Sequence, residues 1–154
     1  MTWRWICAKR GGSSDPVKAD ATITYRDTKD VDLFQLARLF ERAGWHHRTR
    51  DLGRLARLVT HSMYVVSAWR GDTLVGFARA ISDGVSNAYI STVAVLEDEG
   101  QKEILHQLIR RLMDGRDEIT FVLQAVPALA SFYTEEGFEP AEEMYHRPRK
   151  SEGA

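Results

Sequence analysis

The sequence of 154 residues is poor in cysteine, carries almost no net charge and contains no long apolar run. Its single cysteine, Cys7, excludes a disulfide framework within the chain and is typical of a reducing compartment. No apolar segment is long enough to span a membrane, and the N-terminus shows no signal-peptide pattern. The net charge of −1 recruits neither nucleic acid nor an anionic membrane. We therefore expect a cytoplasmic protein with no nucleic-acid and no membrane partner.

Metal-binding patterns are also missing from the sequence. His46 and His47 are adjacent, so their side chains would point apart in an extended segment. His61 and His106 are isolated along the chain, and no spacing typical of zinc ligands occurs around them. We therefore expect no metal site.

What the sequence does contain is enough apolar material for one globular domain. Hydrophobic residues make up 44% of the chain, which can bury a core at this length. Residues 1–20 differ from the rest, because WRWIC indicates a short strand and GGSSDP a linker. Trp3 and Trp5 could stack on a ligand, but two such tryptophans more often form one face of a packed edge strand. We assign the domain to residues 21–149 and a charged tail to residues 150–154.

Hydrophobic periodicity predicts elements in the order β-α-α-β-β-β-α-β-α-β. Strands are expected at residues 21–26, in a hairpin over 63–84 that turns at Gly71, and at 87–95, 118–126 and 142–148. Helices are expected at residues 31–44, 52–62, 101–113 and 127–138. The helix over 101–113 should bury Ile104, Leu105, Leu108, Ile109 and Leu112. A strand meander followed by two strand–helix units predicts an α/β fold with a mixed sheet and helices on both faces.

Three segments within this order, LVGFARAISDG, NAYISTVAV and FYTEEGFEP, resemble the GNAT family of N-acetyltransferases. The nearest likeness is to a bacterial and plastid branch of that family, which is associated with arylalkylamine (serotonin-type) and protein-lysine acetylation. That branch often shows GxARAxSD, an N-A-x-I segment and FYxxLGFE. The resemblance covers residues 62–148, and residues 22–61 by pattern only. It implies the GNAT fold, whose mixed and mostly antiparallel central sheet is splayed at the cofactor site.

The resemblance also implies an activity, a cofactor and a set of site residues. The activity is transfer of an acetyl group from acetyl-CoA to a primary amine, either a small aromatic amine or a protein lysine, by an enzyme that could form a homodimer. The strand ending in Val93, Ala94 and Val95 would bind the pantetheine arm and polarise the thioester carbonyl. The segment after it would receive the pyrophosphate at a helix N-terminus. That segment comprises Gly100, Gln101, Lys102, Glu103, Ile104 and Leu105.

The same resemblance implies that groups around the reacting atoms transfer the protons. Tyr133 would protonate the departing CoA thiolate, although it could instead be a core aromatic beside Phe132 and Phe138. The amine proton could pass to Asp83, Thr92 or His61 through water. Ser-Asp-Gly is also good turn chemistry, which explains Asp83 without a catalytic role. His46 and His47 could line the acceptor entrance.

Another residue of the ARAISD segment, Arg79, ends a strand expected to be buried. An inward arginine would need a carboxylate partner, which we expect from a neighbouring strand.

The expected pyrophosphate loop departs from the family pattern. That pattern, Q/R-x-x-G-x-G/A, aligns without gaps with residues 100–105. Glu103 and Leu105 replace the two small residues that let phosphate oxygens approach the backbone. Thr92 stands where the branch often has an acidic residue. Asp98 and Gln101 match a capping box, which would satisfy the free helix N–H groups with the protein's own oxygens.

Acidic residues add an electrostatic objection, because Glu99 and Glu103 near the first turn would repel a pyrophosphate placed there. Two main functions therefore remain open, besides acyl transfer with a different donor or a shifted CoA pose. The first is an acetyl-CoA-dependent N-acetyltransferase. The second is a catalytically impaired GNAT-fold protein with a binding or regulatory role, which binds CoA weakly or not at all.

Overall fold

The computed structural model describes residues 22–46, 49–97 and 100–148 of the chain. Residues 1–20, with Cys7 and the two tryptophans, lie outside the described residues, as do His47 and the tail at 150–154. The described elements, in chain order, are β1 (Ile23–Arg26), α1 (Leu33–Arg42), α2 (Leu52–Thr60), β2 (Tyr64–Arg70), β3 (Thr73–Ser82), β4 (Asn87–Val95), α3 (Gln101–Met113), β5 (Thr120–Leu123), the 3-10 helix η2 (Pro127–Leu129) and α4 (Ala130–Glu135).

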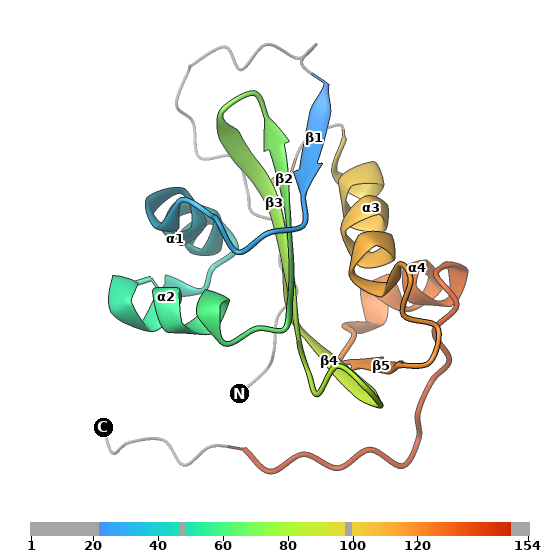
Figure 1. The fold of residues 1–154 in the computed structure, drawn as a ribbon. Helices are drawn as coiled ribbons and strands as arrows, with labels where there is room; N and C mark the ends of the chain where they lie inside the picture. Colours follow the sequence, from blue (N-terminus) through green and yellow to red (C-terminus); the bar gives the residue numbers. More distant parts are fainter. Residues whose placement is uncertain (1–21, 47–48, 98–99, 149–154) are drawn as a thin grey trace.

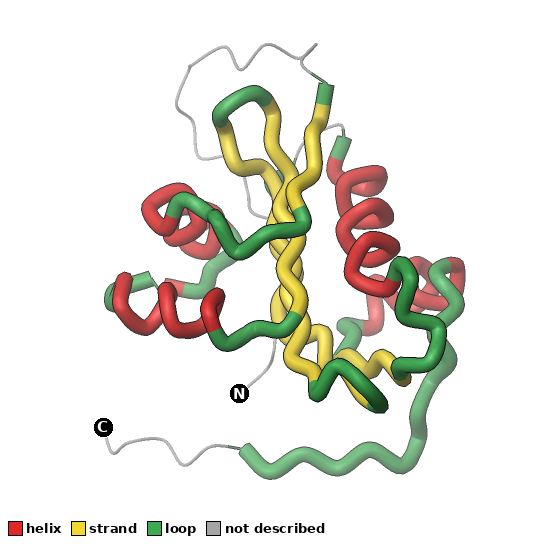
Figure 2. The backbone as a smooth tube through the Cα atoms, in the orientation of Figure 1, coloured by secondary structure: helices red, strands yellow, loops and turns green. Residues whose placement is uncertain are grey.

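The strands form one sheet in the order β1-β2-β3-β4-β5. The first four are antiparallel neighbours, and only β4 and β5 pair in parallel. Helices α1 and α2 cover one face of the sheet, and α3 and α4 cover the other (Figures 1 and 2). The predicted α/β architecture, with a mixed and mostly antiparallel sheet between helices, is confirmed. No helix of the described residues is long and apolar enough to cross a membrane.

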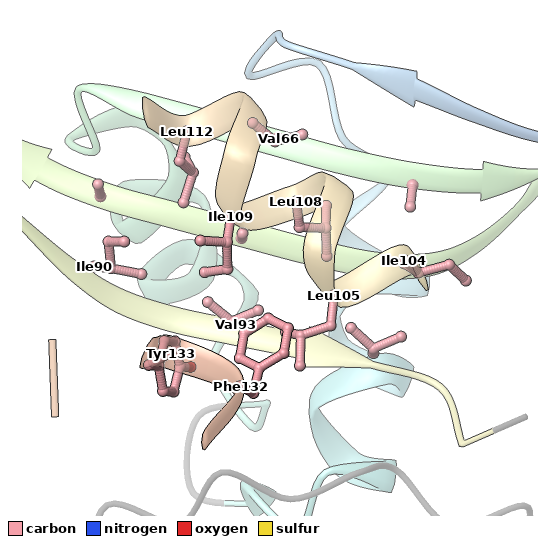
Figure 3. Packing of buried hydrophobic residues seen from close by; sticks show 14 of the residues in the cluster. Val66, Ile90, Val93, Ile104, Leu105, Leu108, Ile109, Leu112, Phe132 and Tyr133 are labelled. Carbon is pink, nitrogen blue, oxygen red and sulfur yellow. The ribbon is translucent and has the colours of Figure 1, made fainter. Parts of the chain in front are cut away.

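Helix α3 packs tightly on the centre of the sheet. Its five predicted core residues are all buried, and Figure 3 shows them against the strands. Gly76 on β3 makes this approach possible, because a Cβ atom there would lie 2.9 Å from Ile104 Cγ2 and 3.1 Å from Leu108 Cδ1. A side chain at position 76 would therefore push α3 away from the sheet.

Helices α1 and α2 begin at aspartate caps on the other face. Asp32 accepts hydrogen bonds from Phe34 N at 2.9 Å and Gln35 N at 3.0 Å, and Asp51 accepts one from Arg54 N at 3.0 Å. Each cap contributes about 1 kcal/mol by satisfying N–H groups that lack a helical partner. The helices bury a second apolar cluster against the sheet, which includes Leu36, Phe40, Leu55, Val59 and Phe77.

Strand β4 separates from β5 partway along its length. The two strands pair from Asn87 with Thr120 to Ile90 with Leu123, whereas β4 itself continues to Val95. Among the described residues, 91–95 have no strand on that side. A bulge marks the same point, because Arg79 pairs with Thr92 and Ala80 with Ile90, leaving Ser91 as an extra residue. This is the predicted splay of the central sheet.

The C-terminal part of the prediction needs correction. No strand forms at residues 142–148, and all of residues 139–148 are exposed, with Tyr145 96% exposed. The segment EEMYHRP has few apolar side chains to bury. The edge strand with which it would have to pair, β5, has only four residues. The predicted strand at 118–126 is correspondingly shorter, and the predicted helix at 127–138 divides into η2 and α4.

The predicted capping box stays a prediction, because it rests on Asp98. The helix begins at Gln101 with Gly100 in the N-cap position, where glycine offers no side-chain cap. Asp98 and Glu99 lie outside the described residues.

Candidate active site

A cavity of about 400 Å³ lies where β4 has left β5. Its walls come from the end of β4, the first turns of α3, and the segment containing η2 and α4. Figure 3 shows Val93, Leu105 and Phe132, one from each wall, close together. The lining residues are Val93, Val95, Gln101, Lys102, Leu105, Val126, Ala128, Leu129, Ser131, Phe132 and Glu135.

Two kinds of backbone group converge on this cavity. The edge of β4 beyond Ile90 faces it without a strand partner among the described residues. The N-terminus of α3 also borders it, where the first N–H groups of a helix and its dipole favour an anion. An extended chain could pair with the strand edge while a negative group occupies the helix end.

The structure brings together five of the nine predicted cofactor-binding residues. Those that line the cavity are Val93, Val95, Gln101, Lys102 and Leu105. The other four are placed elsewhere. Ala94 packs in the cluster under α1 and α2, Ile104 packs against the sheet, and Gly100 is the N-cap of α3.

Glu103 points away from the cavity. Its Oε1 accepts a hydrogen bond of 2.9 Å from Gln107 Nε2. Its charge also acts on β1: burial and then the charge of Glu103 raise the pKa of Tyr25. The carboxylate that should repel a bound phosphate is thus directed along α3 toward the sheet edge. Leu105, the other departure from the small-residue pattern, does line the cavity.

Among the described lining residues, Lys102 and Glu135 carry charge. Lys102 Nζ lies 3.7 Å from Glu135 Oε2, and the two side chains are 73% and 56% exposed. Such an exposed pair contributes little to stability and is easily rearranged. Lys102 would attract an anion at the start of α3, and Glu135 would repel it.

Tyr133 is buried beside the cavity rather than lining it. It is 3% exposed and packs edge to face with Phe132 at 5.0 Å and with Phe138 at 5.6 Å between ring centroids. Burial raises the pKa of its phenol, so the hydroxyl holds its proton. Phe132, which the sequence assigned to the core, is itself a lining residue. The role of Tyr133 as an acid stays a prediction.

Asp83 lies at the opposite end of β4 from the cavity. It accepts hydrogen bonds from the backbone N–H groups of Val85, Ser86 and Asn87 and from Ser86 Oγ. These bonds hold the pKa of its carboxyl below the usual range. The residue therefore does the turn chemistry that its sequence context indicates. At the rise of a strand, its turn is roughly 20 Å from the start of the cavity.

Thr92 lies on the face of the sheet under α1 and α2, in contact with Arg79. Three hydroxyl oxygens accept hydrogen bonds from this arginine: Thr92 Oγ1 from Nε at 3.0 Å, Ser91 Oγ from NH2 at 3.0 Å, and Ser62 Oγ from NH1 at 3.2 Å. Arg79 is 8% exposed. The sequence analysis did not anticipate these three hydroxyl partners. A threonine that accepts from a guanidinium is a weak proton acceptor, so Thr92 as a base stays a prediction without support.

Metal ligands do not gather anywhere in the described part of the chain. No group of three or more histidine, cysteine, aspartate or glutamate side chains there could hold a metal ion.

Residues 35–148 match the family model described as acetyltransferase (GNAT) domain. The chain belongs to the GNAT acetyltransferase family. It is 36% identical over 120 residues to the uncharacterized N-acetyltransferase ycf52 of Porphyra purpurea, covering 73% of this chain and 67% of the relative. A ycf52-like protein of Prochlorococcus marinus is 32% identical over 125 residues, covering 76% and 68%.

Solved GNAT structures share the fold. A GNAT-family acetyltransferase from Streptococcus pneumoniae TIGR4 superposes with a TM-score of 0.65 at 23% identity, covering 84% of this chain and all of that one. This likeness concerns the fold, whereas the function of this GNAT protein depends on the residues of its own site.

One polar network of this GNAT protein was missed from the sequence. The side chain of Glu136, at the end of α4, is 2% exposed. It accepts two hydrogen bonds, of 2.9 and 3.0 Å, from the guanidinium of Arg110 on α3. His106 Nδ1 also contacts Glu136 Oε1, and the histidine ring lies 4.7 Å from Phe132. Although burial opposes it, the hydrogen bonds from Arg110 and His106 hold the pKa of Glu136 below its usual value. The signal was present, because glutamate replaces the leucine of FYxxLGFE.

Proposed function

We propose that this protein transfers an acetyl group from acetyl-CoA to a primary amine, with acetyl-CoA held at the open end of β4. The observation that carries the proposal is the cavity itself. It joins a strand edge, which has no strand partner among the described residues, to a helix N-terminus within a fold of the GNAT family. The pantetheine arm, an extended chain with amide groups, matches the strand edge, and the phosphates match the helix end.

The residues around the cavity fit such a ligand. Val93, Leu105 and Phe132 offer apolar walls, while Gln101 and Lys102 offer polar groups at the start of α3. The thioester of acetyl-CoA supplies an activated carbonyl, whose C–S bond breaks as the amine nitrogen bonds to the carbon. Backbone N–H groups on the edge of β4 would stabilise the charge that develops on the carbonyl oxygen.

Two protons must move in this reaction. The sulfur gains one, and we assign its donor as Tyr133, acting from behind Phe132 with a phenol that burial keeps protonated. The amine loses one, which we assign to water. Asp83 is held in its turn and Thr92 accepts from Arg79, so either would act only through intervening water.

The acceptor that we propose is a small aromatic amine or a protein lysine. Exposed apolar side chains on the sheet face opposite α3 support the aromatic amine as acceptor. Ile81 pairs with Tyr89 across β3 and β4, and Ile81 and Met63 are 48% and 45% exposed. Exposed apolar side chains of this kind suit contact with an aromatic ring.

A catalytically impaired protein remains the second candidate, because two observations favour it. Leu105 fills space at the helix start where the family pattern has a small residue, and Glu135 competes for Lys102. The orientation of Glu103 argues the other way, since its carboxylate does not face the cavity.

Calorimetric titration with acetyl-CoA and with CoA distinguishes the two candidates. The enzyme should bind acetyl-CoA with a micromolar dissociation constant, roughly 8 kcal/mol. It should also release CoA when an arylalkylamine or a lysine peptide is added. No binding at millimolar acetyl-CoA would exclude the enzyme. Micromolar binding would instead exclude an impaired protein that binds CoA weakly or not at all.

A further inference from the structure

Arg79 lies where β4 changes the face on which its side chains are displayed. Ala88 and Ile90 pack in the cluster beneath α3, as alternation along a strand requires. Beyond the bulge, Val93 and Val95 pack in that cluster, whereas strict alternation from Ile90 would have put residues 92 and 94 there. The extra residue Ser91 therefore decides which side chains of β4 meet the cavity.

The arginine bonds to both residues that the bulge brings to one face. Ser91 and Thr92 are consecutive, so in a regular strand their side chains would point to opposite faces. Here both hydroxyls accept hydrogen bonds of 3.0 Å from the same guanidinium. Such a pair of bonds can form only while the bulge is present.

A third bond anchors the guanidinium to the helical layer. Ser62 Oγ accepts from Arg79 NH1 at 3.2 Å and donates to the carbonyl of Leu58 at 2.7 Å. The side chain thus joins β3, the bulge of β4 and the end of α2. A lysine could not replace it, because one ammonium group lacks the planar fork that spans three acceptors.

We propose that Arg79 is a positioning residue for acetyl transfer. By holding Ser91 and Thr92 on one face, it fixes the bulge that turns Val93 and Val95 toward the cavity. The backbone groups of the same residues are thereby aimed at the acetyl carbonyl. This inference rests on the proposed function. Arg79 lies on the other face of the sheet from the lining side chains and acts only through β4.

The test compares Arg79→Lys with Arg26→Lys. Arg26 lies on β1 with its guanidinium 4.4 Å from the Trp69 ring, away from the cavity, so it controls for the loss of an arginine contact. Arg79→Lys should lower kcat about 100-fold, as expected for reacting groups displaced by about 1 Å, while the KM for acetyl-CoA changes far less. Arg26→Lys should leave both unchanged.

Backbone NMR supplies a readout that needs no activity. In Arg79→Lys the amide shifts of residues 91–95 should change, and those of residues 87–90 should not. Ser62→Ala, which removes one of the three bonds, should move the same signals less and serves if Arg79→Lys does not fold. Unmoved signals at residues 91–95 in a folded variant would overturn the inference.

The two proposals fail in different ways. If the wild-type protein shows no acetyl transfer, the proposed function fails and the amide shifts still decide the role of Arg79. If the wild type is active and folded Arg79→Lys retains its kcat, the positioning role is overturned while the proposed function stands.

Discussion

The two ends of β4 are built from one continuous strand and differ in what surrounds them. Residues 88–90 are paired on both sides, by β3 and β5, and the inward side chains Ala88 and Ile90 pack in the cluster beneath α3. Within the described part of the chain, residues 92–95 pair with β3 alone, follow the bulge at Ser91 and border the cavity. In the proposed function, separation from β5 makes this end of β4 a binding edge, because backbone groups that would otherwise pair within the sheet can pair with a ligand.

The largest effect should come from the paired end. Ile90→Ala removes a side chain that is 3% exposed and leaves a cavity under α3, at an expected cost of about 2–5 kcal/mol in the free energy of unfolding. Val93→Ala at the open end should cost less, about 1.5 kcal/mol, because fewer methyl groups are lost.

Urea denaturation and acetyl-CoA titration together test this pair. Ile90→Ala should keep the acetyl-CoA affinity of the folded protein, and Val93→Ala should weaken it. Equal effects of the two variants on affinity would contradict the division of β4 into two ends.

The next effect concerns the helix that closes the open end. Tyr133→Phe removes the proposed proton donor and should lower kcat about 100-fold, the range of general acid catalysis, with the fold retained. Tyr25→Phe, which removes a partly buried hydroxyl on β1, is the control. A steady-state assay with a good amine acceptor measures both. An unchanged kcat in Tyr133→Phe would leave Tyr133 as a core aromatic only.

A smaller effect on acetyl-CoA affinity should distinguish Lys102 and Glu135, whose charges face the cavity, from Glu103, whose charge does not. Lys102→Gln should weaken acetyl-CoA binding and Glu135→Gln should strengthen it, each by about 0.5–1 kcal/mol, and added salt should reduce both changes. Glu103→Gln, on the same helix but directed away, should change affinity least. Tighter binding by Glu103→Gln than by Glu135→Gln would show that Glu103 turns into the cavity.

The smallest effect lies in the clasp between α3 and α4, formed by His106, Arg110 and Glu136. Because the folded pKa of Glu136 is lowered, its contribution to stability is present above its ordinary pKa of about 4 and is lost as the pH falls toward the lowered value. Thermal unfolding followed below pH 5 should therefore show a weaker acid dependence in Glu136→Gln. An acid dependence identical to wild type would mean that the clasp makes no net contribution.

Periodicity and turn chemistry predicted most of the scaffold. The five core residues of α3 repeat at helical spacing, and Gly71 marks the hairpin turn with a φ of 58°. These features depend on local sequence, so one chain suffices to find them. The prediction of a last strand at residues 142–148 was wrong, because a strand needs a partner strand to form. EEMYHRP carries too little apolar surface to compensate for the lack of such a partner among the described residues.

The site was less predictable, because it depends on which way side chains point. Phe132 and Tyr133 are neighbours, and only the packing of α4 shows that the first lines the cavity. Glu103 was expected to oppose a phosphate, yet its carboxylate bonds to Gln107. The bulge at Ser91 depends on pairing between strands, so the three bonds of Arg79 could not be derived from spacing.

Amide hydrogen exchange with and without acetyl-CoA tests the central claim most directly, since it reports separately on the two ends of β4. Acetyl-CoA should slow exchange in residues 91–95 and at the start of α3, and should leave residues 87–90 nearly unchanged. Equal protection of both ends, or none at residues 91–95 under saturating ligand, would contradict a binding edge created where β4 leaves β5.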